Sequence, residues 1–271
     1  MDRYAVFGNP IGQSKSPFIH SQFAVQCAQQ MQYDAILAPV DGFADCWHNF
    51  VASGGKGANV TMPFKEQAYQ LAETLSARAQ LAGAVNTLYI DSTGKVCGDN
   101  TDGVGLVADL IRLGVNLAGC EVLLLGAGGA SRGVIGPLLE AGVSQIVLAN
   151  RSIDKAQAIA ANFDRRVLAC GLTDIPQQAY LLIINATSSG LTGGRPDISA
   201  QHLKHCQLAY DMVYGAQPTT FMSWAKQQGV ARQADGLGML LSQAAAAFTI
   251  WRGVTPDIAT VMTALRLQLT E

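Results

Sequence analysis

A strand, a glycine-rich turn, a helix and a second strand follow one another in residues 122–152, and this run constrains the fold more than any other segment. It reads VLLLGAGGASRGVIGPLLEAGVSQIVLANRS. The apolar run 122–125 is typical of a parallel strand covered on both faces. The glycines of 126–129 allow a tight turn and a close approach to a pyrophosphate, which would bind the free N–H groups of the following helix. The segment predicts a dinucleotide-binding unit, with Ser131 in place of the third glycine of the usual pattern.

The end of the second strand indicates which dinucleotide is bound. An NAD-binding unit usually carries Asp or Glu about 20 residues past the glycines, where it bonds the ribose 2′-hydroxyl. Here the strand ends in Asn150-Arg151-Ser152, with Lys155 one turn further on. A guanidinium binds a 2′-phosphate and stacks on adenine. The alternative is a solvated Arg151 and a Ser152 that only caps the next helix. The spacing from the glycine turn favours binding, so we predict NADP.

Length and composition exclude several other classes of protein. The 271 residues suggest about two domains. Only 14% of the residues are charged and the net charge is −2, which disfavours a nucleic-acid partner. The opening MDRYAVFGNP contains neither a signal peptide nor a membrane span, and the cysteines are scattered without a metal-ligand or disulfide pattern. We therefore expect a cytoplasmic protein without a membrane partner, and either a monomer or a homodimer. The six cysteines are Cys27, Cys46, Cys97, Cys120, Cys170 and Cys206.

The N-terminal third alternates strands and helices and then ends in a hairpin. This order predicts a mixed sheet with helices on both faces. The expected strands are 4–8, 33–40, 58–61 and the hairpin pair 85–90 and 95–97; the expected helices are 17–29, 43–52 and 64–81.

The remainder predicts a helix at 104–113, the nucleotide unit at 121–163, and further strands at 166–169, 181–185 and 208–212. Two helical stretches, 239–252 and 256–269, close the chain with no strand between them. They cannot extend a parallel sheet, so we expect them to pack on the N-terminal part and to make that domain discontinuous.

Three polar clusters in the N-terminal part are candidates for chemistry. In Ser14-Lys15-Ser16-Pro17, Ser16 has a structural explanation as a helix N-cap. Ser14 has no such explanation, and its hydroxyl could bind a carboxylate or a hydroxyl group of a ligand. Lys65 falls in the first turn of a helix, where a cation opposes the helix dipole. Asp102 opens a later helix, where the dipole favours its ionised form. Taken alone, each cluster favours a structural role over a catalytic one.

The positions of the histidines in the sequence do not predict a metal site. His20, His48, His202 and His205 have no acidic partners at ligand spacing. His202 and His205 are three residues apart on a predicted helix and are expected to face solvent.

Together these clusters resemble the shikimate dehydrogenase family, in its bacterial single-function form. The resemblance covers essentially the whole chain. It rests on nine motifs in register: NPIGQSKSPFIH, GANVTMPFK, AGAVNTL, GDNTDGVG, GAGGASRGV, NRS, NATSSG, YDMVY and DGLGMLLSQAA. The resemblance implies two α/β domains around a cleft. Residues 1–101 and 237–271 would form the substrate-binding domain with a mixed sheet, and 102–236 the Rossmann-like NADP-binding domain.

The resemblance also implies an activity and a set of site residues. The reaction would be the reversible, NADPH-dependent reduction of 3-dehydroshikimate to shikimate, with Lys65 and Asp102 as the catalytic pair. The substrate-binding residues would be Ser14, Ser16, Thr61, Asn86, Tyr214 and Gln243. The cofactor-binding residues would be Gly126, Ala127, Gly128, Gly129, Ala130, Asn150, Arg151, Ser152, Lys155, Met212 and Gly236.

Two positions depart from the family pattern. The family tends to show Thr-Pro after the tyrosine of YDMVY, where this chain reads Pro218-Thr219, and Val213 stands where a bulkier side chain is frequent. These changes would alter the loop after Tyr214 and loosen the nicotinamide pocket.

Two other functions compete with this one. One is a dehydrogenase that also oxidises quinate or prefers NAD; the intact serine pair and Arg151 argue against it. The other is a non-catalytic NADP-binding paralogue, which would be expected to lack Lys65 or Asp102.

Overall fold

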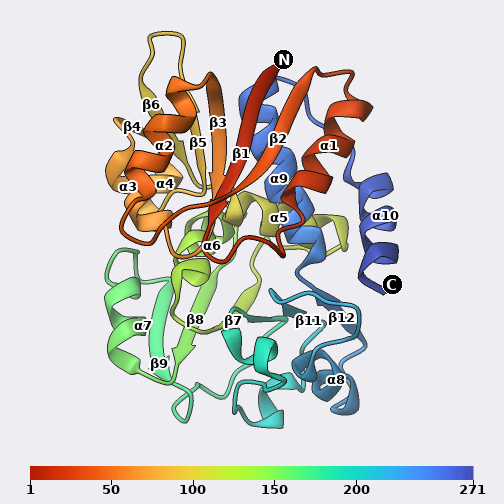
Figure 1. Cartoon of the computed structure of the whole chain (residues 1–271). Coiled ribbons are helices and arrows are strands. Elements are labelled where there is room, and N and C mark those ends of the chain that lie inside the picture. The colour runs from red at the N-terminus through yellow and green to blue at the C-terminus, as the bar shows by residue number, and fades with distance from the viewer. Residues whose placement is uncertain (271) are drawn as a thin grey trace. The chain divides into compact units, whose positions relative to one another are not determined.

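The protein contains two six-stranded sheets, each in its own compact unit (Figure 1). The computed structural model describes residues 1–270. Unit 1 comprises Met1–Gly105 and Leu241–Leu265; unit 2 comprises Leu106–Leu240 and the last residues from Arg266 onward. No helix within residues 1–270 is long and apolar enough to cross a membrane.

The sheet of unit 1 is mixed, as predicted. Its strand order is β2-β1-β3-β5-β6-β4. Strand β1 is parallel to β2 and β3, whereas β5 is antiparallel to both of its neighbours. The strands are β1 (Asp2–Gly8), β2 (Met31–Leu37), β3 (Gly55–Val60), β4 (Thr74–Leu75), β5 (Thr87–Ile90) and β6 (Val96–Asp99). The helices that begin in this unit are α1 (Ser16–Gln26), α2 (Phe43–Ala52), α3 (Lys65–Leu71), α4 (Ala77–Ala82), α5 (Asp102–Arg112) and α10 (Ile258–Thr270).

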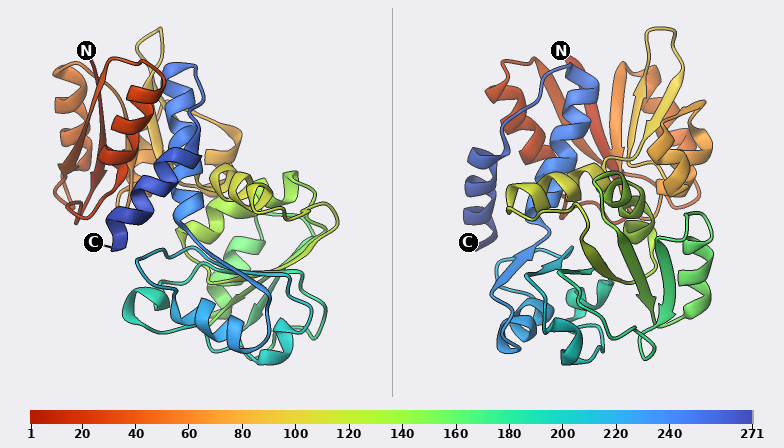
Figure 2. Two further views of the ribbon diagram at one scale, coloured as in Figure 1. Left: turned by 90° about the vertical axis from the view of Figure 1, so that its right-hand side faces the viewer. Right: turned by 180° about the vertical axis from the view of Figure 1, so that it is seen from behind.

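Helices cover both faces of this sheet because side chains alternate along β1. Phe7 packs edge-on against aromatic rings of α2, with ring centroids 5.8 Å from Phe43 and 5.7 Å from Phe50. Tyr4, on the opposite face, stacks on Trp251 of α9 (Leu237–Arg252) at 4.8 Å. Helix α1 lies beside α9 on that second face (Figure 2), where Phe23 contacts Phe248.

The single helix expected at residues 64–81 was wrong. The chain leaves the helical conformation at Ala72 and runs through the short strand β4 before α4 begins. The Glu73 N–H donates to the Val96 carbonyl oxygen at 2.8 Å, so this segment pairs with β6. The Ser76 hydroxyl then accepts from the Ala79 N–H and caps α4. Pairing with a distant strand thus overrides a locally helical pattern.

The sheet of unit 2 is entirely parallel, in the order β12-β11-β10-β7-β8-β9. The strands are β7 (Glu121–Leu125), β8 (Gln145–Asn150), β9 (Val167–Gly171), β10 (Leu182–Asn185), β11 (Leu208–Asp211) and β12 (Arg232–Asp235). The helices are α6 (Gly129–Glu140), α7 (Ile153–Ala160), α8 (Thr220–Gln227) and the 3-10 turns η1 (Ser188–Thr192) and η2 (Ala200–Leu203). The sequence patterns missed β12, whose RQAD holds a single apolar residue, because it is a short edge strand.

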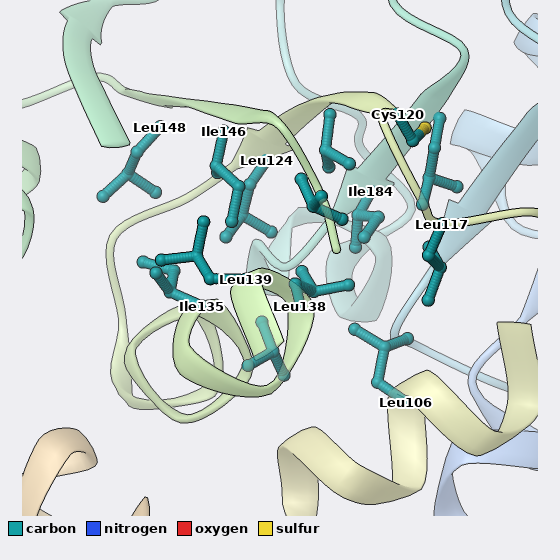
Figure 3. Close-up of a cluster of buried hydrophobic side chains, with 14 of the residues drawn as sticks. Leu106, Leu117, Cys120, Leu124, Ile135, Leu138, Leu139, Ile146, Leu148 and Ile184 are labelled. Carbon is teal, nitrogen blue, oxygen red and sulfur yellow. The ribbon is translucent and has the colours of Figure 1, made fainter. Parts of the chain in front are cut away.

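One face of this sheet packs against α6 (Figure 3). Leu124, Ile146 and Ile184 come from three neighbouring strands, and Ile135 and Leu138 from the helix; all five are fully buried. This packing anchors α6 and fixes where the glycine turn at its N-terminus lies.

Two histidines are buried rather than solvent-exposed. The expectation that His202 faces solvent was wrong, because its side chain is 4% exposed beside Tyr180. His20 is fully buried, and its ring stacks on Tyr33 with centroids 4.2 Å apart. Its Nε2 lies 3.1 Å from Asn59 Oδ1, and its Nδ1 has no partner within residues 1–270.

The hydrogen bonds around Asn59 assign the tautomer of His20. Asn59 Nδ2 donates to the Asn86 carbonyl oxygen and to Thr87 Oγ1, so Asn59 Oδ1 is an acceptor. His20 Nε2 therefore carries the proton and Nδ1 is bare. A second proton would sit in an apolar surrounding, and this burial lowers the pKa of His20 to about 3.

We predict that His20 makes the fold acid-sensitive. The unfolded chain takes up a proton near pH 6.5, whereas the folded chain does so only near the lowered pKa of His20, about 3. Stability is therefore lost as the pH falls between these values, by about 2 kcal/mol from about pH 7.5 to about pH 5. Urea unfolding at both pH values measures this loss. His20→Gln keeps a donor for Asn59 without titrating, so its stability should fall less steeply with acid. An unchanged slope in this variant would contradict the prediction.

Candidate active site

Lys65 and Asp102 form an ion pair at the starts of two helices of unit 1. Lys65 is the first residue of α3 and Asp102 the first residue of α5. Lys65 Nζ donates to Asp102 Oδ2 at 2.6 Å, and the two side chains are 28% and 11% exposed. The cation opposes the dipole of its own helix, whereas the carboxylate is favoured by its own. The pair thus offsets an unfavourable position for the lysine.

Asn86 fixes the carboxylate of Asp102 from its other side. Its Nδ2 donates to Asp102 Oδ1 at 2.7 Å and to Thr101 Oγ1 at 3.0 Å. Its Oδ1 accepts from the Thr101 N–H at 2.8 Å and from the Thr87 hydroxyl at 2.8 Å. Gln243 Oε1 lies 3.4 Å from both Asn86 Nδ2 and Thr101 Oγ1. Asn86, Gln243 and the ion pair therefore form one connected polar cluster.

The serine segment before α1 differs from the expectation. Ser16 is the first residue of α1, and Lys15 occupies the N-cap position without a side-chain cap. Ser14 Oγ instead accepts from the Ser16 N–H at 3.3 Å. The prediction that Ser14 has no capping role was wrong, because its hydroxyl oxygen serves the helix start. The Ser16 hydroxyl is buried and is a hydrogen-bond partner of the Tyr33 phenol.

Thr61 directly follows β3, in the strand-to-helix connection that leads to Lys65. Its N–H donates to the Phe7 carbonyl oxygen at 2.9 Å, and its carbonyl oxygen accepts from the Phe64 N–H at 3.0 Å. The backbone on both sides of this half-buried threonine is therefore fixed, and Phe64, fully buried beside Phe43, anchors the residue before Lys65.

The glycine-rich turn of unit 2 has the geometry of an anion cradle. Gly126 has φ +104°, a left-handed conformation that other residues rarely adopt. A Cβ added at Gly128 or Gly129 would meet nothing within 4 Å, so open space lies over the start of α6. No side chain caps that helix. The Ser131 hydroxyl donates to the Gly126 carbonyl oxygen at 2.6 Å, which explains why a serine replaces the third glycine.

The residues expected to recognise the adenosine end lie around the end of β8. Asn150 Oδ1 accepts from the Ala127 N–H at 3.3 Å and so ties this strand end to the glycine turn. Arg151, Ser152 and Lys155 are exposed. Ser152 occupies the N-cap position of α7 without a side-chain cap bond. Among residues 1–270 Arg151 makes no ion pair, so none of their carboxylates neutralises its guanidinium.

Met212 and Gly236 approach each other at the ends of β11 and β12. A Cβ at Gly236 would lie 2.0 Å from the Met212 carbonyl oxygen, so only glycine fits. The Met212 N–H donates to the Asn185 carbonyl oxygen at 2.9 Å. Tyr214, two residues further on, is half-buried, and burial raises the pKa of its phenol.

The Pro218-Thr219 order has a structural explanation. The Thr219 hydroxyl oxygen caps α8 by accepting from the Met222 N–H at 3.2 Å. The same hydroxyl donates to Asp211 Oδ2 at 2.6 Å, and the Val213 N–H donates to Asp211 Oδ1 at 3.1 Å. Asp211 is fully buried, and this burial raises its pKa. Sequence reasoning did not single out Asp211, which connects the Val213 loop to α8.

No group of three or more metal-ligand side chains occurs in the part of the chain that the structure describes.

Comparison with known proteins defines the class and the family. Residues 6–88 match the shikimate dehydrogenase substrate binding domain, 109–207 the shikimate / quinate 5-dehydrogenase family, and 236–266 the shikimate 5'-dehydrogenase C-terminal domain. The shikimate dehydrogenase (NADP(+)) of Shewanella halifaxensis is 52% identical over 270 residues, covering 99% of this chain and 96% of that protein.

Solved structures agree over the full length. The Ael1 enzyme from Pseudomonas putida is 44% identical with a TM-score of 0.94, covering 100% of this chain and 99% of that one. Shikimate 5-dehydrogenase from Thermus thermophilus, in complex with NADP(H) and shikimate, is 34% identical with a TM-score of 0.89, covering 99% and 100%. These matches define a dehydrogenase built from two α/β units. The chain belongs to the shikimate dehydrogenase family.

Proposed function

We propose that this chain catalyses the reversible NADP-dependent reduction of 3-dehydroshikimate to shikimate. The observation that carries the proposal is the 2.6 Å contact between Lys65 Nζ and Asp102 Oδ2, which joins a proton donor to a group that orients it. The 52% identical relative is itself named as an NADP(+) shikimate dehydrogenase.

The residues of unit 2 fit NADP. The open space over Gly128 and Gly129 and the uncapped start of α6 suit a pyrophosphate, held by the turn from Gly126 to Ala130. Asn150, Arg151, Ser152 and Lys155 would hold the adenosine end, with Met212 and Gly236 beside the nicotinamide. When bound, NADP supplies or accepts the hydride at C3 of the substrate.

Lys65 would handle the proton of the same oxygen. In the reductive direction the lysine gives a proton to the oxygen on C3 as the carbonyl becomes a hydroxyl, and in the oxidative direction it takes that proton back. Asp102 would accept a hydrogen bond from the hydroxyl and so orient it toward Lys65. Asn86 restrains the carboxylate on its other side, because it donates to Asp102 Oδ1 at 2.7 Å.

The remaining polar residues would orient the ring of the substrate. Ser14 and Ser16 would bind the carboxylate, with the phenol of Tyr214 as a third donor. The ring hydroxyls would be bonded by Thr61, Asn86 and Gln243. This division is supported by the polar cluster of Asn86 and Gln243 around the ion pair, where a hydroxyl beside Asp102 would find further partners.

Two other possibilities are less well supported. Part of the chain matches a family described for both shikimate and quinate, so oxidation of quinate is the alternative activity. The extra hydroxyl of quinate lies beside its carboxylate, and the serine pair expected to bind that carboxylate is intact. A non-catalytic NADP-binding protein would have no need of the Lys65–Asp102 contact.

Because all six cysteines are free thiols, we also propose the cytoplasm as the location.

The test of the proposed function is the rate of NADPH formation from shikimate and NADP, compared with the rates with NAD and with quinate. We expect fast turnover only with shikimate and NADP. Comparable rates with quinate or NAD would contradict the proposed specificity for shikimate and NADP. They would leave the proposed role of the Lys65–Asp102 pair unchanged. No turnover in any combination, with NADPH still bound, would support the non-catalytic alternative.

We expect Lys65→Ala to lower kcat by on the order of 10²–10⁴ with little change in the KM for shikimate, because it removes the proton donor and not a binding group. Lys56→Ala, which changes an exposed lysine of the same unit, serves as the control. A near-normal kcat for Lys65→Ala would exclude the proton-transfer role.

We expect Arg151→Ala to raise the KM for NADP much more than the KM for NAD, because only NADP carries the 2′-phosphate. Arg165→Ala, at another exposed arginine of unit 2, should change neither value. Equal increases for the two cofactors would mean that Arg151 does not recognise the phosphate.

A further inference from the structure

Asp99, three residues before Asp102, is a buried carboxylate held by several donors. Arg78 of α4 donates from Nε to Oδ1 at 2.7 Å and from Nη2 to Oδ2 at 2.6 Å. The Ser76 hydroxyl donates to Oδ1 at 2.5 Å. The Asp99 side chain is 11% exposed, and that of Arg78 is 31% exposed. This two-point contact fixes both the position and the plane of the carboxylate.

One chain of hydrogen bonds runs from Asp99 to Asp102 through Asn100. The Asn100 N–H donates to Asp99 Oδ1 at 2.7 Å. The Asn100 side chain then donates from Nδ2 to the Ala84 carbonyl oxygen at 3.0 Å and accepts from the Asp102 N–H at 3.2 Å. Asn100 is 2% exposed, so no solvent replaces these contacts. The orientation of Asp99 therefore sets where the backbone of Asp102 begins α5.

A second chain runs from Asp99 to Asp102 through Asn86. The Asp99 carbonyl oxygen accepts from the Asn86 N–H at 3.0 Å. The Asn86 side chain in turn donates to Asp102 Oδ1 at 2.7 Å. The backbone and the carboxylate of Asp102 are thus each connected to Asp99, by separate routes.

We infer that Arg78 is a positioning residue for the reaction: through its two-point contact with Asp99 it fixes the carboxylate of Asp102 against Lys65. The inference rests on the proposed function of the Lys65–Asp102 pair. Arg78 itself touches neither of these two side chains in the structure, so its effect passes through Asp99.

The physical consequence of losing Arg78 follows from the burial of Asp99. Without the guanidinium, the buried carboxylate keeps two donors among residues 1–270, the Ser76 hydroxyl and the Asn100 N–H. The segment 99–102 then shifts to bring the carboxylate nearer to water. A displacement of about 1 Å at a catalytic group costs up to about 10²-fold in rate. Lysine presents a point charge without the planar fork, so Arg78→Lys should restore only part of the rate.

The experiment compares five variants in shikimate oxidation: Arg78→Met, Arg78→Lys, Asp99→Asn, the double variant Arg78→Met/Asp99→Asn, and Arg252→Met as the control. Arg252 pairs with Asp2 at the start of β1, a strand of seven residues or about 20 Å, whereas Lys65 follows the far end of the parallel strand β3. We expect Arg78→Met to lower kcat by about 10–100-fold with an unchanged KM for NADP. The double variant should be no slower than the slower single variant, because both changes break one contact. Arg252→Met should keep kcat within about threefold of the unmodified protein.

A readout without substrate separates this inference from the proposed function. The Cε resonance of Lys65 in protein carrying ¹³C-labelled lysine reports the contact with Asp102, and Asp102→Asn supplies the reference for its loss. We expect Arg78→Met, or Arg78→Lys if the methionine variant does not fold, to move this resonance toward the reference, and Arg252→Met to leave it unchanged. This result would stand even if the unmodified protein did not oxidise shikimate. An unmoved resonance, or an equal loss of kcat in Arg252→Met, would overturn the role of Arg78.

Discussion

The buried polar side chains of unit 1 are arranged around the contact between Lys65 and Asp102. Each residue opens a helix, but only the carboxylate gains from the dipole of its own helix. The lysine is therefore stable at this place because the carboxylate of a different helix faces it at 2.6 Å. Both helix starts must be fixed to better than the length of a hydrogen bond. The buried amides of Asn86 and Asn100 provide that precision, since each bonds backbone groups on one side and Asp102 on the other.

In unit 2, the backbone N–H groups at the start of α6 have no side-chain cap, and other contacts stabilise the helix. The N-terminus of α6 lacks a side-chain cap, and open space lies beside Gly128 and Gly129 at this helix start. The helix itself is held by the apolar packing of Ile135 and Leu138 on the sheet. The turn is held by the Ser131 hydroxyl and by Asn150, both of which bond backbone groups of the turn. The backbone N–H groups that we propose to bind the pyrophosphate thus stay available, because apolar packing stabilises the helix.

Sequence patterns predicted most of this architecture because the strands of unit 2 are buried on both faces. Their continuous apolar runs, as in residues 122–125, are hard to mistake for exposed structure. The errors fall where a distant partner decides the local structure. Residues 72–76 look helical but pair with β6, and β12 has almost no apolar signal because it is an edge strand. The capping role of Ser14 was missed because a hydroxyl before a helix start fits a ligand as well as it fits a backbone N–H.

Some candidate site residues stand out in the sequence, whereas others are recognised only from their contacts in the fold. Lys65 and Arg151 stand out because their charge is unexpected at their place in a helix or at a strand end. Arg78 gives no such signal, since an arginine on a short surface helix is ordinary and its partner Asp99 is twenty-one residues away in the sequence. Only the fold shows that this arginine donates from two of its nitrogens to a buried carboxylate. Residues that act through others are therefore found from hydrogen-bond networks rather than from motifs, and in this chain the network around Asp102 extends beyond the GDNTDGVG motif to α4.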